Sequence, residues 1–284
     1  MKKTILLFPL VAAGLVACGG GNAENTITIA ASELPHAKIL KEAVAPVLKE
    51  KGYTLEVREL EWTLQNPAVA RGEYDANYFQ HTPYLNTYNA EASKDAQLTM
   101  VVKCHYEKLC LYASDLNHKT LANGDKIEIV NDISNIERAL LMLKDNGVIK
   151  EISAECYEDG EFKHFLVDKP NSQVTFADAY KDCSLTCIQE SNLAIALGDY
   201  NFGVLPGNAA LTGLGEDYAK RIVFGEKVDE ATLSLRANGV AFRAADKDSK
   251  KAKAIVEAFA DKRVEDYIKS TFGESVLYHY EALI

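Results

Sequence analysis

The chain has 284 residues, of which 25% are charged and 48% hydrophobic, and its formal net charge at pH 7 is −10. This length suffices for one large or two smaller hydrophobic cores, and the composition is ordinary for a soluble globular protein. The acidic balance argues against a nucleic-acid partner, because contacts with phosphates need clustered Lys and Arg.

The N-terminus has the pattern of a bacterial secretory leader. A short basic start precedes an apolar run over residues 5–16, which is too short to span a bilayer. The junction Leu-Val-Ala-Cys, which ends at Cys18, resembles the cleavage site of bacterial lipoproteins. We therefore predict a signal peptide over residues 1–17, acylation of Cys18 (palmitate among the chains) and a flexible tether over residues 18–25. This predicts a cell-envelope protein anchored to a bacterial membrane; the alternative is an ordinary leader that ends near a cysteine.

The first elements of the mature chain form a βαβ pattern. Residues 27–31 are β-branched or small and predict a strand, and residues 54–58 alternate like a second strand. Between them, residues 37–51 carry apolar side chains at helical spacing, with Gly52 as the stop signal. Pro46 predicts a kink within that helix. Such a unit indicates a largely parallel sheet.

An aromatic segment follows over residues 75–85, with the sequence Asp-Ala-Asn-Tyr-Phe-Gln-His-Thr-Pro-Tyr-Leu. Rings alternate with hydrogen-bonding groups, and Pro83 predicts an irregular segment without a strand or a helix. This mixture is typical of a small-molecule pocket. Trp62, the single tryptophan, and Asn66 follow the second strand, at the end where open α/β sheets bind ligands. The alternative is an aromatic core loop, with Trp62 as a core residue.

The later part of the chain predicts two connections and two helices. Residues 101–113 hold two apolar runs around a polar centre, and residues 233–243 hold another run. We expect the first to be a strand that leaves one lobe and the second to be the returning strand. Residues 249–260 and 263–272 have the spacing of amphipathic helices.

Two further stretches offer polar groups at the ends of predicted strands. Residues 127–130 predict a strand, and the Ser-Asn-Ile-Glu sequence at 134–137 has the spacing of a helix capping box. Arg138 is then expected in the first turn, where a helix N-terminus and a guanidinium favour an anion. Residues 202–205 predict a strand that delivers Asn208 after a Pro-Gly pair. The alternatives are a capped helix with a surface arginine, and a turn asparagine.

Five cysteines remain after Cys18, and their state stays open at this point: Cys104, Cys110, Cys156, Cys183 and Cys187. Partial disulfide pairing is compatible with export, and buried free thiols are an equal alternative. Zinc with His105 and His164 is a weaker idea, because no compact Cys-x-x-Cys pair occurs. We predict no metal site and no cofactor.

Motifs of catalysis are missing from the sequence. It contains no Gly-x-Ser-x-Gly elbow, no His-Glu-x-x-His helix, no phosphate loop and no dinucleotide fingerprint. We therefore predict a binding protein and no enzyme. An exported hydrolase with an unrecognised site and a surface adhesin are the less favoured alternatives.

The aromatic segment at 75–85 resembles the signature of the NlpA family, the methionine-binding lipoproteins of bacterial ABC importers. The segments at 131–143 and 202–211 are similar to two further motifs of that family, and the likeness extends from about residue 27 to the C-terminus. The resemblance implies a two-lobe α/β fold with two crossover strands and a ligand cleft between the lobes. It divides the chain into lobe 1, residues 26–109 with 236–284, and lobe 2, residues 110–235.

The resemblance also implies the ligand and its contacts. Asn135 and Arg138 fall on the positions that hold the carboxylate of an amino acid, and Asn208 on the position that holds its amine. The other expected ligand-binding residues are Trp62, Asn77, Tyr78, Phe79, His81 and Tyr84. The implied ligand is methionine, with another amino acid or a methionine-containing dipeptide as the alternative. The implied partners are the transmembrane permease subunits of an ABC importer.

The chain departs from the family pattern at several positions. Ile136 and Glu137 replace two glycines in the segment with Arg138, and Pro206 replaces an asparagine near Asn208. Members of the family that this chain resembles carry a tyrosine near the position of Trp62. These changes bear on the size of the ligand and on which side chain fits the pocket.

Overall fold

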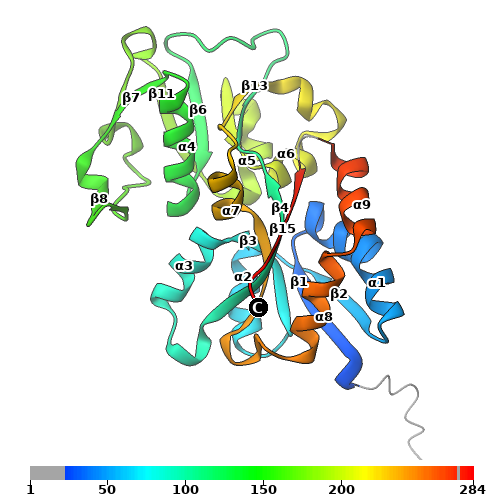
Figure 1. Cartoon of the computed structure of the whole chain (residues 1–284). Coiled ribbons are helices and arrows are strands. Elements are labelled where there is room, and N and C mark those ends of the chain that lie inside the picture. Colours follow the sequence, from blue (N-terminus) through cyan, green and yellow to red (C-terminus); the bar gives the residue numbers. More distant parts are fainter. Residues whose placement is uncertain (1–22, 274–275) are drawn as a thin grey trace, which may run out of the picture.

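The computed structural model describes residues 23–273 and 276–284 and has two lobes (Figure 1). The predicted signal peptide, Cys18 and the first part of the tether lie outside the described residues. In Figure 1 the blue, cyan, orange and red segments form one lobe, so this lobe contains both ends of the described chain. The green and yellow segments form the other lobe.

Lobe 1 is built on a six-stranded mixed sheet with the order β15-β4-β14-β3-β1-β2. Strand β1 pairs in parallel with β2 and β3, whereas β14 and β15 pair antiparallel with their neighbours. The strands are β1 (Thr26–Ala31), β2 (Thr54–Glu59), β3 (Ala76–His81), β4 (Leu98–Glu107), β14 (Asn238–Arg243) and β15 (Val276–Ala282). The predicted strands at 27–31 and 54–58 are therefore confirmed.

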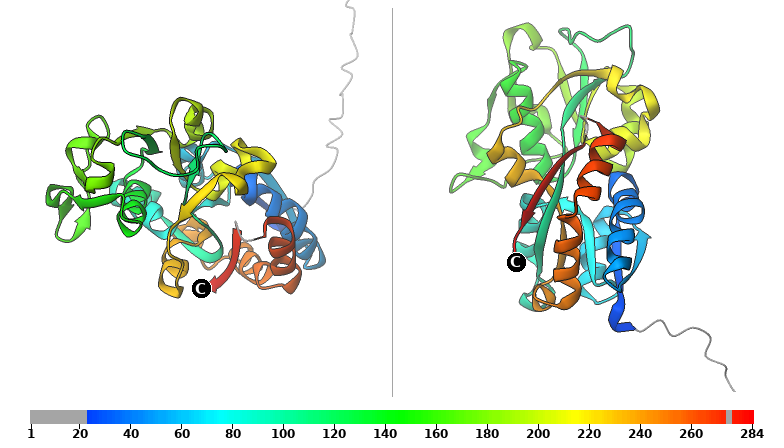
Figure 2. Two further views of the ribbon diagram at one scale, coloured as in Figure 1. Left: turned by 90° about the horizontal axis from the view of Figure 1, so that it is seen from above. Right: turned by 45° about the vertical axis from the view of Figure 1, so that its right-hand side comes forward.

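Helices cover both faces of this sheet. Val240 and Phe242 of β14 pack into the main core of lobe 1, and Ala241 between them packs into a second cluster, as strand alternation requires. The main core is covered by α1 (Ala45–Glu50), α8 (Lys250–Phe259) and α9 (Lys262–Phe272), which lie side by side in Figure 2. The other face is covered by α2 (Trp62–Ala70) and α3 (Thr82–Glu91).

Lobe 2 has a five-stranded sheet with the order β11-β6-β12-β5-β13. Its strands are β5 (Cys110–Ala113), β6 (Lys126–Val130), β11 (Ser184–Ile188), β12 (Phe202–Leu205) and β13 (Ile222–Gly225). One face carries α4 (Ile133–Asp145), and the other carries α5 (Glu190–Ala196) and α6 (Gly207–Gly213). Two small antiparallel pairs extend the first face: β7 (Ile149–Ile152) with β10 (Val174–Phe176), and β8 (Tyr157–Glu158) with β9 (Glu161–Phe162).

The chain passes between the lobes twice. Strand β4 ends at Glu107 in one sheet, and β5 begins at Cys110 in the other. The return runs from β13 through α7 (Glu230–Arg236) to β14. The predicted two-lobe α/β fold is confirmed, but the returning strand begins at Asn238 instead of 233. The side chain of Asp229 accepts the backbone N–H of Thr232 and starts a helix there.

Pro46 and Pro83 each lie in the first turn of an α-helix. The helical segment at 37–51 changes from a π-helical turn, Leu40–Val44, to α1, and Pro46 lies in the first turn of α1. The prediction of an irregular segment at 75–85 is wrong, because β3 runs to His81 and α3 starts at Thr82. Pro83 is in the first turn of α3, where a missing N–H costs no hydrogen bond.

The five described cysteines are free thiols. Cys104, Cys110, Cys156 and Cys183 are buried, and Cys187 is half-buried. Of the alternatives left open by the sequence, buried free thiols are therefore the one that the structure contains.

Glu128 of β6 makes stability depend on pH. Its side chain is buried, and neither carboxylate oxygen has a hydrogen-bond partner among the described residues. Burial, with a smaller contribution from Asp199, raises the pKa of Glu128 to about 8. In the unfolded chain the pKa of a glutamate is about 4.3. Because the pKa of Glu128 is higher in the folded state, its contribution to stability is fully present below about pH 4.3 and is lost as pH rises toward 8.

We therefore expect Glu128→Met to be more stable than the wild type at pH 8 and to lose that advantage near pH 5. Methionine fills similar space without a buried charge. Urea unfolding of both proteins from pH 5 to pH 8 measures the difference. Parallel stability profiles across this range would show that folding does not raise the pKa of Glu128.

Candidate ligand-binding site

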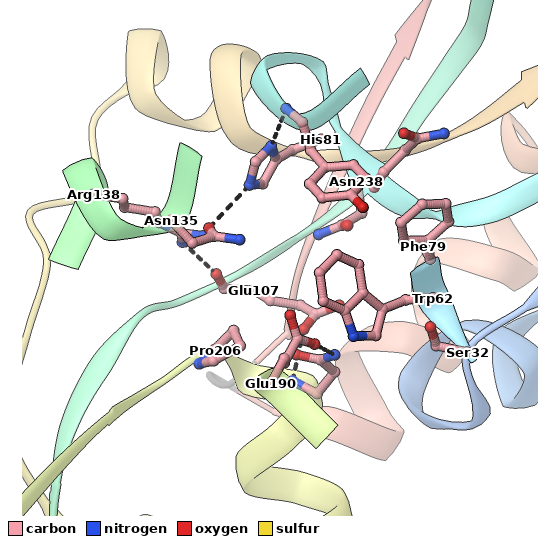
Figure 3. Close-up of a pocket in the computed structure, with 13 residues that line it drawn as sticks. Ser32, Trp62, Phe79, His81, Glu107, Asn135, Arg138, Glu190, Pro206 and Asn238 are labelled. Carbon is pink, nitrogen blue, oxygen red and sulfur yellow. Dashed lines mark hydrogen bonds between the residues drawn. The ribbon is translucent and has the colours of Figure 1, made fainter. Parts of the chain in front are cut away.

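A cavity lies between the lobes and is lined by residues of both (Figure 3). Lobe 1 contributes the ends of β1, β3, β4 and β14 and the first turns of α2 and α3. Lobe 2 contributes α4 and the N-terminal residues of α5 and α6. The lining residues are Ser32, Trp62, Phe79, Gln80, His81, Tyr84, Glu107, Asn135, Arg138, Glu190, Pro206, Asn208 and Asn238.

Three aromatic rings form the apolar wall of the cavity. Trp62 begins α2, Phe79 belongs to β3, and Tyr84 is in the first turn of α3. The ring centroids of Trp62 and Tyr84 are 5.2 Å apart, and those of Phe79 and Tyr84 are 5.5 Å apart, both edge to face. The indole Nε1 of Trp62 is buried without a hydrogen-bond partner in the described chain. It is therefore a donor that a ligand in the cavity can use.

His81 connects the two lobes across the cavity. Its Nδ1 accepts the backbone N–H of Tyr84 at 3.2 Å, so the proton of the neutral ring is on Nε2. Nε2 then donates to Oδ1 of Asn135 in lobe 2, at 3.1 Å. Burial, together with the nearby charges of Arg138 and Arg236, lowers the pKa of His81 to about 3. The ring is thus neutral at physiological pH, and the bond joins α4 to β3.

The helix that carries Arg138 begins earlier than predicted. The capping box at 134–137 is wrong, because Asp132 is the N-cap and its side chain accepts the N–H of Asn135 at 3.0 Å. The hydroxyl of Ser134 donates to Asp132 Oδ1 at 2.8 Å instead of capping the helix. Arg138 therefore lies in the second turn of α4. A carboxylate that precedes the helix is both a hydrogen-bond acceptor and a favourable charge at this end.

Arg138 is buried and already has an acidic partner in the chain. Its Nε donates to Oε2 of Glu226 at 2.7 Å, its Nη2 donates to the other carboxylate oxygen, and Nη2 also donates to the carbonyl oxygen of Glu107 at 2.7 Å. Its guanidinium lies 5.4 Å from the centre of the Tyr106 ring. No hydrogen bond of Nη1 is found within the described part of the chain. Arg138 is thus a fixed cation with one group left for a ligand.

The pair of Arg138 and Glu226 stays charged although it is buried. Burial alone lowers the pKa of an arginine, but Glu226 raises the pKa of Arg138 above its usual value. Burial likewise opposes ionisation of Glu226, but the neighbouring Arg138 lowers the pKa of that carboxyl. Each charge depends on the other, so removing one partner leaves an uncompensated charge in the interior.

Asn208 and two glutamates form the other polar end of the cavity. Asn208 lies in the first turn of α6, not in a turn between elements. Its backbone N–H donates to Glu107 Oε2, and its side-chain amide donates to Glu190 Oε1, both at 2.6 Å. Burial raises the pKa of Glu190 to about 8, and nearby acidic groups add to this effect. Burial also raises the pKa of Glu107. Carboxyl groups in such a setting accept a cationic group readily.

Two of the residues expected at the site do not line this cavity. Asn77 is buried in an amide network, where it donates to Asn66 at 2.8 Å and accepts from Gln80 at 2.9 Å. Tyr78 points to the opposite face of β3 and packs against Phe259 of α8, with ring centroids 5.4 Å apart. Successive strand residues face opposite sides, so Tyr78 points into the core of lobe 1 while the neighbouring Phe79 points to the other side of β3.

The other expected positions line the cavity: Trp62, Phe79, His81, Tyr84, Asn135, Arg138 and Asn208. The sequence analysis did not predict Ser32, Gln80, Glu107, Glu190, Pro206 and Asn238 as ligand contacts. Asn238 is the first residue of β14, where the chain returns from lobe 2, and Glu107 is the last residue of β4, where the chain leaves lobe 1. Polar residues at the ends of crossing strands are a signal that could have identified these two.

The arrangement suits a small zwitterion with an apolar side chain. One end offers a fixed cation and the other offers carboxyl groups with an amide, while rings form the wall between them. Figure 3 shows Arg138, Glu190, Trp62 and Phe79 around one space. Among the described residues, no helix is both long and apolar enough to cross a membrane.

Comparison with known proteins gives a consistent assignment. The family model described as NlpA lipoprotein matches residues 27–161. The methionine-binding lipoprotein MetQ of Bacillus subtilis is 31% identical over 290 residues, which cover 98% of this chain and 98% of that protein. Outer membrane lipoprotein 1 of Mannheimia haemolytica is 28% identical, over 97% of this chain and 98% of that protein.

A solved structure has the same fold. The nutrient binding protein of Burkholderia cenocepacia, bound to methionine, superposes with a TM-score of 0.76 at 26% identity, over 89% of this chain and 99% of that one. The identity to the Bacillus protein extends over both lobes and nearly the whole of each chain. On these grounds, the chain belongs to the NlpA lipoprotein family.

Proposed function

We propose that this protein captures methionine at the cell surface and delivers it to the permease of an ABC importer. The observation that carries the proposal is the cavity between the lobes, where Arg138, the aromatic wall and Glu190 are spaced around one small volume. Relatives named as methionine-binding lipoproteins support this substrate. The family consists of substrate-binding proteins, so the function is binding and not catalysis.

Each part of methionine has a complementary group in the cavity. The carboxylate pairs with Arg138 and the amide of Asn135, and the ammonium group with Asn208 and Glu190. The side chain lies against Trp62, Phe79 and Tyr84, with His81 beside it. A thioether is polarisable and gains about 0.3–1.5 kcal/mol from each ring contact, which favours methionine over leucine.

Calorimetric titration with methionine, leucine, glutamine and cystine tests the proposal. We expect methionine to bind most tightly, and mass spectrometry of protein purified without unfolding to identify the same amino acid. Tighter binding of another amino acid would refute the substrate assignment. Glycyl-methionine and methionyl-glycine are included because a dipeptide is the second candidate.

Binding is expected to close the lobes. A ligand that contacts residues of both lobes stabilises the closed state selectively. The lobe boundaries that we propose are residues 26–109 with 236–284 for lobe 1, and 110–235 for lobe 2. The separation of the two sheets in the chain supports these boundaries. The closed form then docks on the transmembrane permease subunits, which a cytoplasmic ATPase drives.

The position at the membrane is expected to depend on Cys18. Several acyl chains on one cysteine anchor a protein stably, whereas a single chain binds only marginally. We predict that Cys18→Ser releases the protein from the membrane fraction while methionine binding stays unchanged. Fractionation of cells followed by immunoblotting measures this. An unchanged membrane fraction in the variant would contradict the anchor, and Cys104→Ser is the control for loss of a thiol.

A further inference from the structure

Three potential metal ligands meet in the interior of lobe 1, beside the cavity. His36 lies in the helical turn after β1, and His105 and Glu107 lie near the end of β4. Oε1 of Glu107 is 3.2 Å from Nε2 of His36 and 2.9 Å from Nε2 of His105. The donor atoms of the three side chains all lie within 4.8 Å of one another. They therefore form one buried cluster of potential metal ligands.

Among the described residues, one member of this group, His36, is left without a hydrogen bond. The side chain of His36 is 1% exposed, and neither of its ring nitrogens has a hydrogen bond within the described residues. Its Nε2 is close to Glu107, but the angle does not meet hydrogen-bond geometry. A buried polar group without a partner is destabilising, and an ion that accepts its lone pair is one way in which proteins satisfy it.

Neighbouring groups orient the other two side chains toward the same point. The hydroxyl of Tyr78 is hydrogen-bonded to Nδ1 of His105, and Nε2 of His105 is hydrogen-bonded to Oε1 of Glu107 at 2.9 Å, so a metal ion would replace the proton of this second bond. Oε2 of Glu107 accepts the backbone N–H of Asn208 at 2.6 Å, so Oε1 is the oxygen that faces the histidines. Partners of this kind are those that hold metal ligands in proteins.

All three side chains lie in the interior. His36 is 1% exposed, His105 is 0% exposed and Glu107 is 3% exposed. A cation at this point offsets the cost of a buried Glu107 carboxylate.

We propose that His36, His105 and Glu107 bind a divalent transition-metal ion, with zinc as the best match. Zinc takes two imidazole nitrogens and a carboxylate oxygen at about 2.0–2.2 Å, and the distances of 3.2 and 2.9 Å from Glu107 to the two histidines suit its tetrahedral geometry. Three protein ligands leave one position open. Imidazole donors disfavour calcium and magnesium. The cysteines and His164, which the sequence suggested as zinc ligands, are not part of this group.

Metal analysis of the untagged mature chain in detergent is the direct test. After treatment with a chelator and dialysis against zinc, we expect one zinc ion per chain by mass spectrometry. With Co²⁺ in place of zinc, we expect the visible absorption of a four-coordinate ion, without the near-ultraviolet absorption of thiolate ligands. Neither measurement requires a variant. Absence of stoichiometric zinc, or a thiolate spectrum, would overturn the proposal.

Variants identify the ligands. His36→Asn, His105→Asn and Glu107→Gln are each expected to weaken zinc binding by more than about 100-fold, which exceeds the effect of losing a supporting group. His164→Asn is the control, because His164 is exposed and lies in lobe 2. Circular dichroism confirms folding of each protein. Zinc binding that survives in the folded His36 and His105 variants would overturn the proposal, whether or not methionine binds.

Discussion

Arg138→Ala is expected to lose at least about 25-fold in affinity for its amino acid. Truncating a desolvated partner of a bound charge costs about 2–5 kcal/mol, and about 1.4 kcal/mol corresponds to tenfold in affinity. A surface arginine would contribute at most about 1 kcal/mol, but Arg138 is buried and lines the cavity. Titration calorimetry with methionine measures the loss.

The same substitution is expected to destabilise the fold. Glu226 then stays in the interior without its counter-charge, and breaking a buried pair in this way costs about 3–5 kcal/mol. No pattern in the sequence marks Glu226 as the partner of Arg138, so this cost follows from the structure alone. Urea unfolding followed by circular dichroism measures the change and sets the conditions under which the variant is folded.

A double variant separates binding from stability. Glu226→Gln keeps an acceptor for the backbone N–H of Leu109, which donates to Oε1 at 2.6 Å, and removes the charge. We expect Arg138→Ala with Glu226→Gln to regain much of the stability but none of the affinity. Arg138→Lys should recover only part of the affinity, since the planar fork is lost. Binding of methionine by folded Arg138→Ala within threefold of wild type would show that Arg138 is not the anchor.

Glu190 is expected to make methionine binding depend on pH. Its carboxyl has a pKa of about 8 in the protein without ligand, and a bound ammonium group favours the ionised form. At pH 5 the carboxyl must give up its proton for the ammonium group to pair with it. We therefore expect affinity to rise from pH 5 to pH 8 by up to about tenfold per pH unit.

In the protein without ligand, Glu190 makes the folding stability fall as pH rises, whereas the affinity for methionine rises. A folded-state pKa above the unfolded value of about 4.3 means that stability is lost as pH rises toward 8. Methionine is expected to reverse this loss. The histidines near the cavity do not titrate in this window, since burial lowers the pKa of His36 to about 4 and of His81 to about 3.

Glu190→Gln tests the assignment. We expect this variant to bind methionine more weakly at pH 8 and with little dependence on pH. Glu230→Gln is the matched control, because Glu230 is an exposed glutamate in the first turn of another short helix, α7. A pH dependence that persists in Glu190→Gln would assign the proton to a different group, with Glu107 as the next candidate.

Local patterns in the sequence determined most of the secondary structure. The strands at 27–31 and 54–58 and the helices at 249–260 and 263–272 follow from side-chain periodicity, which depends only on near neighbours in the chain. The wrong predictions concerned positions where the local sequence is compatible with two different structures. Pro83 begins a helix instead of interrupting a segment, and Asp132 caps α4 instead of Ser134.

The motifs in the sequence also identified most of the cavity, because they consist of residues close together in the chain. Trp62, His81, Arg138 and Asn208 were predicted from such motifs and line the same space. The sequence could not show which side chains of a motif face the ligand. Tyr78 and Phe79 are equally aromatic, and only the packing of β3 between β1 and β14 turns Tyr78 toward α8.

Contacts between distant residues were decided by the tertiary structure alone. Glu226 pairs with Arg138 across 88 positions of sequence, and His36 meets Glu107 because the turn after β1 packs beside the end of β4. No periodicity encodes such a meeting, since it depends on the order of strands in a sheet and on how the two lobes come together. The pairing with Glu226 that keeps Arg138 charged, the raised pKa of Glu190 and the grouping of His36, His105 and Glu107 all exist only in the folded chain.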